Sequence, residues 1–433
     1  MSAFDDSHDP KRISWVESAN GHPLFPIQNL PFGVFSTDRQ EADKRIGVAI
    51  GESILDLKSL AKSALLDEHW RLALSLPALN AWFGHGLGDA RALRLRLSEL
   101  LSDPQAKAKV EEHLVPVTEA TMHLPAHIGD YTDFYVGIHH ATNVGKQFRP
   151  ENPLLPNYKY VPIGYHGRAS SVRVSGTPVV RPMGQRKAPD ADAPEYGPSR
   201  RLDYELELGI FIGKGNALGE PIPIGEAAGH IAGYCLLNDW SARDLQAWEY
   251  QPLGPFLAKN FLTSISPWVV TPQALAPFMR PMPPRPEGDP APLAYLADPA
   301  ERGALGIRLE TVLVTQQMRD RSLPPYVLSE GEAASAMYWS AAQIVTHHAS
   351  NGCNLQPGDL IGTGTLSTDD PRGLGSLLEI SQGGKAPITL PSGETRSFLE
   401  DGDELTLSAR CEAPGAVPIG FGWVSGRVEG LGG

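Results

Sequence analysis

The chain has 433 residues, of which 41% are hydrophobic and 20% charged, the composition of an ordinary globular protein of two or three domains. Its 50 acidic and 37 basic residues give a formal net charge of −13, which disfavours nucleic acid as a partner because acidic surfaces repel phosphate. Glycine (44) and proline (39) are abundant, which argues against a helical bundle and favours many short strands.

Targeting signals are not apparent in the sequence. No segment approaches the roughly 18–20 consecutive apolar residues that a membrane span needs, and the first residues lack the basic and apolar regions of a signal peptide. The three cysteines, Cys235, Cys353 and Cys411, are an odd number at wide spacings, which is typical of a reducing compartment. We therefore expect a soluble cytoplasmic protein that binds neither membranes nor nucleic acid.

The first third of the chain is predicted to be a unit of its own, with its boundary near residue 120. A helix is expected after residue 57, through Leu60, Ala64 and Leu65. A longer one is expected from about Asp89, where leucines recur at helical spacing, to its stop at Asp103-Pro104. Residues 107–117 carry mixed charges and are interpreted as a linker. The strand-like segments of this part are 32–35, 45–50 and 54–57.

Beyond residue 120 the pattern is mostly β. One helix is predicted over 332–348, because Ala336, Trp339 and Gln343 fall along one stripe. No repeat of 20–50 residues is visible, which disfavours solenoids and propellers. The strand-like segments are 172–174, 204–212, 230–238, 268–270, 307–316, 388–390 and 405–409.

Common catalytic signatures are absent from the sequence. It contains no GxSxG, HExxH or GxxxxGK[ST] pattern, which excludes elbow-type serine hydrolases, zincins and P-loop enzymes. The glycines of 213–219 are spaced one residue too widely for a dinucleotide-binding loop, so we interpret this segment as a hairpin turn.

Two acidic residues alternate with apolar ones in a predicted strand. Alternation places Glu205 and Glu207 on one face and Leu206 and Leu208 on the other. Residues on the same face of a strand lie about 6–7 Å apart, which allows their carboxylates to share one cation. A solvated strand face explains the same pattern equally well, and the two readings stay open at this point.

A second candidate group follows the next apolar strand. Asp239 ends that strand, and a short helix is predicted through residue 250. Arg243, Gln246 and Tyr250 are spaced so that they share one face of this helix, which favours a face that binds a substrate. The alternatives are a surface stripe, or packing of the aromatic residues on the core.

The third candidate group is an acidic and aromatic stretch, 129–135, followed by His139 and His140. Adjacent histidines point in different directions, so at most one is expected in a given site, and a structural role is equally compatible. The best candidate ligands are carboxylate oxygens, which suit Mg²⁺ or Ca²⁺ better than Zn²⁺.

Several long motifs resemble the fumarylacetoacetase family. The resemblance runs nearly from end to end, and it is densest over about 129–270 and 337–380. Its clearest motifs are 129–135 (GDYTDFY), 140–145 (HATNVG), 164–171 (GYHGRASS), 237–244 (LNDWSARD), 252–256 (PLGPF) and 351–354 (NGCN).

The resemblance implies a mainly β, α+β protein. Residues 1–120 would form a small N-terminal SH3-like barrel domain with helices, and residues 121–433 a C-terminal catalytic, metal-binding β-roll in a homodimer. The implied enzyme is a hydrolase that cleaves a carbon–carbon bond of 4-fumarylacetoacetate to give fumarate and acetoacetate, the last step of tyrosine and phenylalanine breakdown. The cofactor would be Mg²⁺ or Ca²⁺, and the partner a small-molecule substrate.

The resemblance also assigns roles to residues. The implied metal carboxylates are Asp133, Glu205, Glu207 and Asp239, supported by Lys259 and Thr263. His140 corresponds to the general base and Glu379 to the acid that orients it, while Arg243, Gln246 and Lys259 would stabilise negative charge. The implied substrate contacts are Tyr135, Arg149, Tyr165, Arg243, Gln246, Tyr250 and Thr365.

Two departures from the family pattern concern the surroundings of these residues. His139 stands where a non-ionisable polar residue is expected, and Pro150 follows Arg149 where a small or polar residue is expected. Alternative functions are a related enzyme of the superfamily, such as an acylpyruvate hydrolase or a hydroxydienoate isomerase or decarboxylase, and a non-catalytic metal-binding scaffold.

Overall fold

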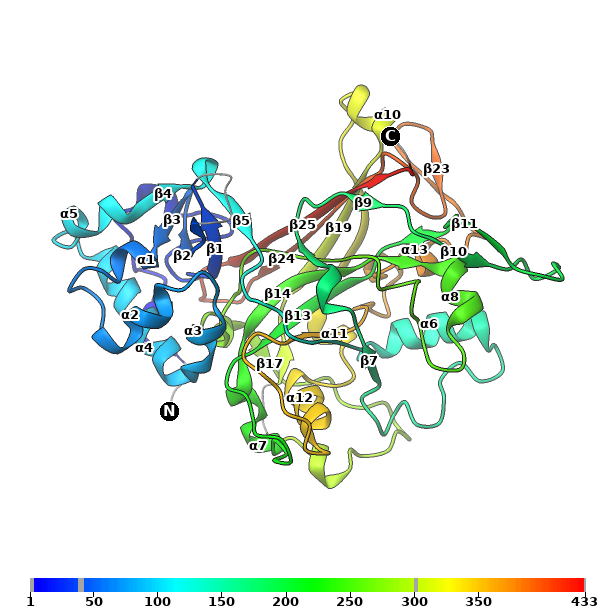
Figure 1. Cartoon of the computed structure of the whole chain (residues 1–433), viewed down its shortest axis with the longest axis horizontal. Helices are drawn as coiled ribbons and strands as arrows, with labels where there is room; N and C mark the ends of the chain where they lie inside the picture. Colours follow the sequence, from blue (N-terminus) through cyan, green and yellow to red (C-terminus); the bar gives the residue numbers. More distant parts are fainter. Residues whose placement is uncertain (1–3, 38–42, 300–302, 432–433) are drawn as a thin grey trace.

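The computed structural model describes residues 4–37, 43–299 and 303–431. The fold is mostly β with helices, as the composition predicts. In Figure 1 the N-terminal part (blue to cyan) lies beside a larger part made from the rest of the chain. Strand β25 (Ile419–Glu429) reaches toward the N-terminal part, where the backbone amide of Gly420 donates to the carbonyl of Leu24.

The N-terminal part contains a five-stranded antiparallel sheet in the order β4-β3-β2-β1-β5. The strands predicted at 32–35 and 45–50 are confirmed. The linker predicted over 107–117 is wrong, because this segment forms a short helix and then an edge strand that pairs with β3. The strands are β1 (Phe32–Ser36), β2 (Arg45–Ile50), β3 (Ser53–Asp56), β4 (Leu114–Pro116) and β5 (Thr121–His123).

Within residues 4–37 and 43–125, five α-helices accompany this sheet. The long predicted helix is confirmed as α4, and its buried leucines, Leu93, Leu97 and Leu101, face the N-terminal core. The helix expected to reach Leu65 ends earlier, at Leu60, and turns follow it. The helices are α1 (Leu57–Leu60), α2 (Glu68–Leu74), α3 (Asn80–Gly84), α4 (Gly86–Ser102) and α5 (Lys107–Val110).

A seven-stranded mixed sheet forms the centre of the larger part, in the order β7-β6-β21-β13-β14-β16-β8. Its middle pair, β13 and β14, is antiparallel, whereas β21 runs parallel to β6. The strands are β6 (Tyr131–Phe134), β7 (Gly164–His166), β8 (Val172–Val174), β13 (Leu206–Ile212), β14 (Ile231–Asp239), β16 (Thr263–Ile265) and β21 (Leu360–Gly362).

A second five-stranded sheet has the order β20-β19-β24-β25-β9. Its strands are β9 (Val179–Val180), β19 (Arg308–Val314), β20 (Tyr326–Glu332), β24 (Glu404–Cys411) and β25 (Ile419–Glu429). Short two-stranded pairs complete the β structure: β10 (Met183–Arg186) with β11 (Glu195–Pro198), β12 (Leu202–Asp203) with β15 (Ser241–Ala242), β17 (Met279–Arg280) with β18 (Ala304–Leu305), and β22 (Ile388–Thr389) with β23 (Thr395–Arg396).

The prediction of one continuous helix over 332–348 is wrong. The segment forms two helices, which are separated by a break at 337–340. Ser340 caps the second helix, accepting from the amide of Gln343 while the Gln343 side chain accepts from the Ser340 amide. The helices of this part are α6 (Ile138–Phe148), α7 (Ile224–Ala227), α8 (Arg243–Glu249), α9 (Pro272–Leu275), α10 (Gln316–Asp320), α11 (Ala333–Ala336), α12 (Ala341–Ala349) and α13 (Leu377–Ile380).

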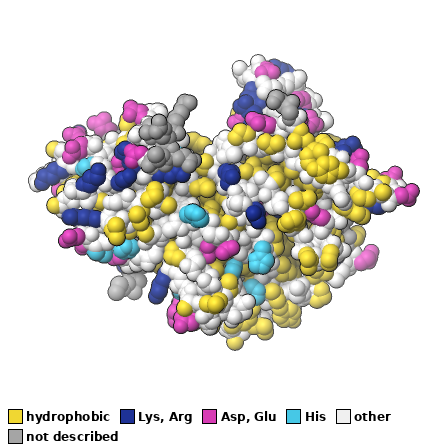
Figure 2. Space-filling view, viewed as in Figure 1, with side chains coloured by type: hydrophobic (Ala, Val, Ile, Leu, Met, Phe, Trp, Pro, Cys, Tyr) yellow, Lys and Arg dark blue, Asp and Glu magenta, His cyan; other side chains and the backbone are white. Residues whose placement is uncertain are grey.

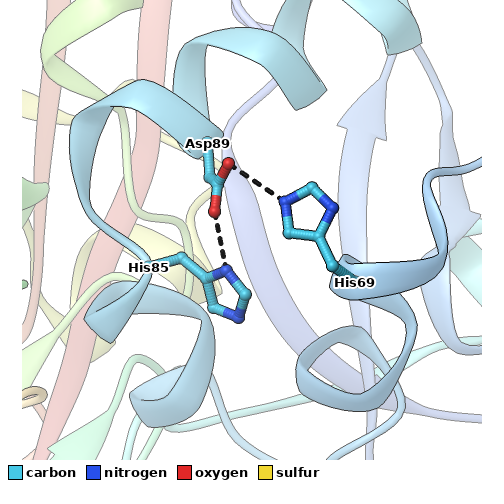
Figure 3. A group of neighbouring side chains, drawn as sticks. All are labelled: His69, His85 and Asp89. Atoms are coloured by element: carbon cyan, nitrogen blue, oxygen red, sulfur yellow. Dashed lines mark hydrogen bonds and ion pairs between the residues drawn. The ribbon is translucent and has the colours of Figure 1, made fainter.

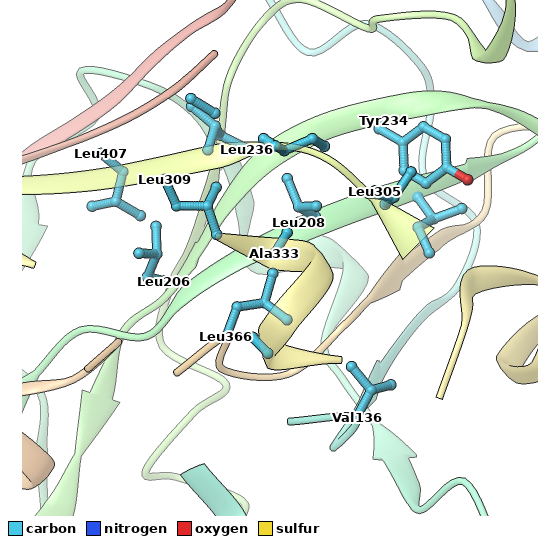
Figure 4. Packing of buried hydrophobic residues seen from close by; sticks show 14 of the residues in the cluster. Val136, Leu206, Leu208, Tyr234, Leu236, Leu305, Leu309, Ala333, Leu366 and Leu407 are labelled. Atoms are coloured by element: carbon cyan, nitrogen blue, oxygen red, sulfur yellow. The ribbon is translucent and has the colours of Figure 1, made fainter. Parts of the chain in front are cut away.

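The core of the larger part lies between its two large sheets. Leu206 and Leu208 of β13 point toward Leu309 of β19 and Ala333 of α11, as Figure 4 shows. The other end of β13 contributes Phe211 to a different cluster, which is built mostly by the N-terminal part. The same strand therefore supports both cores.

Charged side chains of both signs are interspersed on the face drawn in Figure 2. Among the described residues, no helix combines the length and apolar character needed to cross a membrane.

Helix α6 is held close to the following loop by a glycine. A Cβ on Gly145 would lie 2.0 Å from the carbonyl oxygen of Pro153, whereas Gly88 of α4 has open space around it. In a helix, alanine is more favourable than glycine by up to about 1 kcal/mol of stability. An added side-chain atom that clashes with a close neighbour lowers stability by about 1–3 kcal/mol. We predict that Gly145→Ala destabilises the protein and that Gly88→Ala does not, as measured by urea unfolding. Equal effects of the two substitutions would contradict this close approach.

Candidate active site

Four buried carboxylates gather at the ends of neighbouring strands of the central sheet. Asp133 belongs to β6, Glu205 precedes β13, Glu207 lies within β13, and Asp239 ends β14. One carboxylate oxygen of each lies within 4.8 Å of the corresponding oxygens of the others. The structure thus brings together all four acids that the sequence predicts as metal ligands.

Two cations lie against this cluster. The Lys259 Nζ donates to Glu205 Oε2 and to Asp239 Oδ2, both at 2.6 Å. Arg243, the first residue of α8, donates from Nη1 to Glu205 Oε1 at 2.7 Å. Thr263, which pairs with Asp239 across β14 and β16, donates to Asp239 Oδ1 at 3.0 Å. Glu205 is therefore compensated by both cations.

The remaining carboxylates are not neutralised to the same extent. Burial and the charge of Asp239 raise the pKa of Asp133 well above its usual value, and burial and Asp133 do the same to the pKa of Glu207. Burial also raises the pKa of Asp239. Burial opposes ionisation of Glu205 too, but Lys259 and Arg243 outweigh it and hold its pKa well below the usual range.

The donor set fits a hard divalent cation. All four candidate ligands offer carboxylate oxygens, the atoms that Mg²⁺ and Ca²⁺ prefer. The buried Asp133 Oδ1 and Glu207 Oε1 have no hydrogen-bond partner in the part of the chain that the structure describes. Gly362 of β21 lies between these two acids, where a Cβ would come within 2.5 Å of Asp133 Oδ1 and 3.1 Å of Glu207 Oε2. The bare backbone of β21 thus leaves room beside the carboxylates.

A histidine–glutamate pair lies next to the cluster. His140 of α6 and Glu379 of α13 are both buried, and His140 Nδ1 is 2.6 Å from Glu379 Oε2. Asn143 donates to the other oxygen of Glu379, while Ser367 and Ser376 donate to Oε2. Despite the burial of Glu379, which acts in the opposite direction, His140, Asn143 and Ser367 hold its pKa below the usual value.

The free edge of the imidazole faces the carboxylates. With Nδ1 bonded to Glu379, the His140 Nε2 points toward Glu205, 3.9 Å from its Oε1. Glu379 therefore fixes the orientation of the ring and places Nε2 where it can exchange a proton at the cluster.

Asp203 connects the two sides of the site. It accepts from Arg243 Nε at 2.9 Å and from the backbone amides of Leu377 and Leu378 at 2.8 and 3.0 Å. Those amides begin α13, the helix that carries Glu379. One fully buried carboxylate thus fixes both the guanidinium of Arg243 and the start of α13.

The predicted substrate contacts lie around this centre at different distances. The ring of Tyr135 meets His140 edge-on at 5.6 Å between centroids, Tyr165 donates to Asp239 Oδ2 at 3.1 Å, and Gln246 accepts from Arg243 Nη1 at 3.1 Å. The others are placed by their elements: the buried Thr365 follows β21, Arg149 follows α6 with Nη2 3.4 Å from the carbonyl of Pro153, and Tyr250 follows α8.

The two unusual positions noted in the sequence lie on one cavity. His139 and Pro150 line an opening of about 720 Å³ together with Asn143, Lys146, Glu379 and Lys385. Its lining includes none of the four carboxylates. His139 lines this cavity itself, whereas His140 is buried and adjoins the cavity only through its partner Glu379.

Sequence reasoning missed the residues that position the site. Asp203 and Gly362 were not predicted, nor were Asn143, Ser367 and Ser376. One signal was available: Ser376 and Glu379 have the S-x-x-E spacing of a capping box, which marks the start of a helix. The role of Gly362 depends on the pairing of distant strands and leaves no local signal.

Comparisons with known proteins identify the family of the chain. The model of the fumarylacetoacetate hydrolase C-terminal region matches residues 131–429, and that of the fumarylacetoacetase N-terminal region matches residues 28–125. The chain belongs to the fumarylacetoacetate hydrolase family. Similar proteins of this family are the fumarylacetoacetases of Homo sapiens, 49% identical over 93% of this chain and 96% of the relative, and Arabidopsis thaliana, 44% identical over 93% and 95%.

A solved structure of the family supports the fold. The fumarylacetoacetate hydrolase from psychrophilic Exiguobacterium antarcticum superposes with a TM-score of 0.51 at 17% identity, covering 93% of this chain and 99% of that one. The resemblance stated from the sequence motifs is confirmed.

The raised carboxylate pKa values predict an unusual pH dependence of stability without metal. Above the ordinary carboxyl pKa of about 4, the folded state keeps protons that the unfolded chain has lost, so stability falls as pH rises. We predict that the melting temperature of chelator-treated protein falls between mildly acidic and neutral pH, and that added Mg²⁺ removes the fall. Glu207→Gln should flatten the metal-free profile. A flat profile in the unsubstituted protein would contradict the pKa shifts.

Proposed function

We propose that the chain hydrolyses 4-fumarylacetoacetate to fumarate and acetoacetate, as the names of its close relatives indicate. The observation that carries the proposal is the buried His140–Glu379 pair, whose free Nε2 faces a cluster of four carboxylates at 3.9 Å. This arrangement can activate water beside a bound cation, which hydrolysis of a β-diketone requires.

His140 is the general base of the proposed reaction. Its Nε2 takes a proton from water, whose oxygen attacks the carbonyl carbon on the fumaryl side, and Glu379 stabilises the resulting imidazolium through Nδ1. When the tetrahedral intermediate collapses, the bond to the methylene carbon breaks and its electron pair leaves with the acetoacetyl fragment. That carbon then takes up a proton, so the atoms of one water are divided between the products.

The negative charge that develops has two kinds of stabilisation. A divalent cation on Asp133, Glu205, Glu207 and Asp239, supported by Lys259 and Thr263, would supply Lewis acidity toward the diketone oxygens. Arg243, Gln246 and Lys259 provide cationic and amide donors for the intermediate, and losing one such donor typically costs about 100- to 1,000-fold in rate. Tyr135, Arg149, Tyr165, Tyr250 and Thr365 complete the proposed substrate contacts.

Further features are proposed from the same resemblance. Mg²⁺ or Ca²⁺ is the proposed ion, a homodimer the proposed assembly, and the cytoplasm the proposed location. Residues 1–120 are proposed as a small SH3-like barrel domain with helices, supported by the antiparallel sheet β4-β3-β2-β1-β5, and residues 121–433 as the catalytic β-roll domain.

The activity is tested by the loss of fumarylacetoacetate absorbance. We expect decay with enzyme and Mg²⁺, arrest by a chelator, and recovery when Mg²⁺ is restored in excess. Acylpyruvates and a hydroxydienoate should turn over much more slowly. Preferential turnover of either of those substrates would replace the proposed function by that of a related enzyme, and turnover unaffected by complete metal removal would remove the cation from the mechanism.

The role of His140 is tested with its neighbour as the control. His140→Ala should lower kcat by about 100- to 10,000-fold, the usual contribution of a general base, while the melting temperature and Mg²⁺ affinity change little. His139→Ala should retain turnover within a few fold, because His139 lines the cavity of about 720 Å³ described above, whose lining includes none of the four carboxylates. The mechanism fails if His140→Ala keeps near-normal turnover.

A further inference from the structure

A second cluster of metal-binding residue types lies in the N-terminal part. His69 of α2, His85, which directly precedes α4, and Asp89 in the first turn of α4 converge, as Figure 3 shows. Asp89 lies between the two rings, with Oδ1 3.2 Å from His69 Nε2 and Oδ2 2.8 Å from His85 Nδ1. None of these residues belongs to the carboxylate site described above.

We propose that these three side chains bind a transition-metal ion of the Zn²⁺ type. Two imidazole nitrogens and one carboxylate oxygen are the ligands that Zn²⁺ uses, in contrast to the oxygen ligands of the carboxylate site. The three ligand atoms lie within 4.8 Å of one another. With bonds of about 2.0–2.2 Å, one ion fits between them after small side-chain adjustments, and its fourth position remains open to solvent.

The surroundings orient the ligands as such a site requires. A metal-binding histidine usually donates its other ring N–H to a carboxylate, and His69 Nδ1 lies 2.7 Å from Asp67 Oδ1. When Nε2 loses its proton, this bond keeps the other nitrogen protonated and leaves the Nε2 lone pair free to bind an ion beside Asp89. Trp82 stacks on His85 at 5.3 Å between centroids with planes 28° apart, which holds the second ring in place.

Asp67 distinguishes this cluster from an ordinary surface ion pair. His22 is such a pair: its Nε2 lies 3.3 Å from Glu52 Oε1, and no second histidine or orienting carboxylate within the described ranges accompanies it. At the proposed site, ligands from α2 and from the start of α4 would be joined by one ion. Because the unfolded chain lacks this arrangement, binding should stabilise the N-terminal part.

The test is calorimetric titration of full-length protein with Zn²⁺, in the presence of saturating Mg²⁺ and at mildly alkaline pH, where imidazole is deprotonated. We expect one equivalent of Zn²⁺ to bind and the melting temperature to rise. His69→Gln and Asp89→Asn should abolish this equivalent. Asp67→Asn should weaken it by about 10- to 100-fold, the usual effect of losing an orienting partner. His22→Gln is the matched control and should bind normally.

The variant Asp239→Asn shows whether the bound Zn²⁺ occupies the carboxylate site, because Asp239 is a proposed Mg²⁺ ligand there. The Zn²⁺ equivalent should persist in that variant, and it should persist in wild-type protein even if the chain fails to hydrolyse fumarylacetoacetate. Circular dichroism and turnover of the His69 and Asp89 variants verify that they fold. Unchanged Zn²⁺ binding in folded His69→Gln or Asp89→Asn, or loss of the equivalent in Asp239→Asn, would overturn the proposal.

Discussion

Placing several like charges in one buried volume is the constraint on which the rest of the site depends. The negative charge of Glu205 is compensated by two cations, because Lys259 and Arg243 both donate to its carboxylate. Asp133, Glu207 and Asp239 share less of this compensation, and their pKa values are raised as a result. Carboxylates in this condition gain most from a cation, since the ion replaces the protons they would otherwise hold.

The hydrogen bonds around the cluster fix the positions of the carboxylates, the guanidinium and the imidazole relative to one another. Asp203 binds Arg243 on one side and the first amides of α13 on the other, so Glu379 and the guanidinium are positioned by a common anchor. Glu379 in turn is held by His140, Asn143 and two serines. Each group that would move or stabilise a proton is thus fixed by at least one buried hydrogen bond, which reduces the reorganisation needed during reaction.

Local patterns predicted the parts of the site that lie on one strand or helix. Alternation put Glu205 and Glu207 on one face, and helical spacing grouped Arg243 with Gln246, which are in fact hydrogen-bonded. Patterns could not show that β21 would lie between β6 and β13, because strand order depends on pairings between residues more than 100 positions apart. Roles for Asp133 and His140 therefore came from the family resemblance and not from periodicity.

The errors in the fold have similar causes. The mixed charges of 107–117 are typical of a linker, yet the segment contains β4, an edge strand in which two side chains are half-buried and one is exposed. The break near Met337 was hidden because apolar and small residues continue the helical stripe through it. Short strands and broken helices are decided by tertiary contacts, which local propensity does not contain.

Strands β13 and β14 contribute side chains to two hydrophobic cores, so the two parts of the molecule depend on each other. Phe211, Cys235 and Leu237 of these strands are buried against the N-terminal part, although Glu207 and Asp239 of the same strands belong to the carboxylate cluster. Removing the N-terminal part would uncover these apolar side chains, which lie on the same sheet face as Glu207 and Asp239, farther along the strands. The two parts thus share one hydrophobic cluster, so each buries apolar surface of the other.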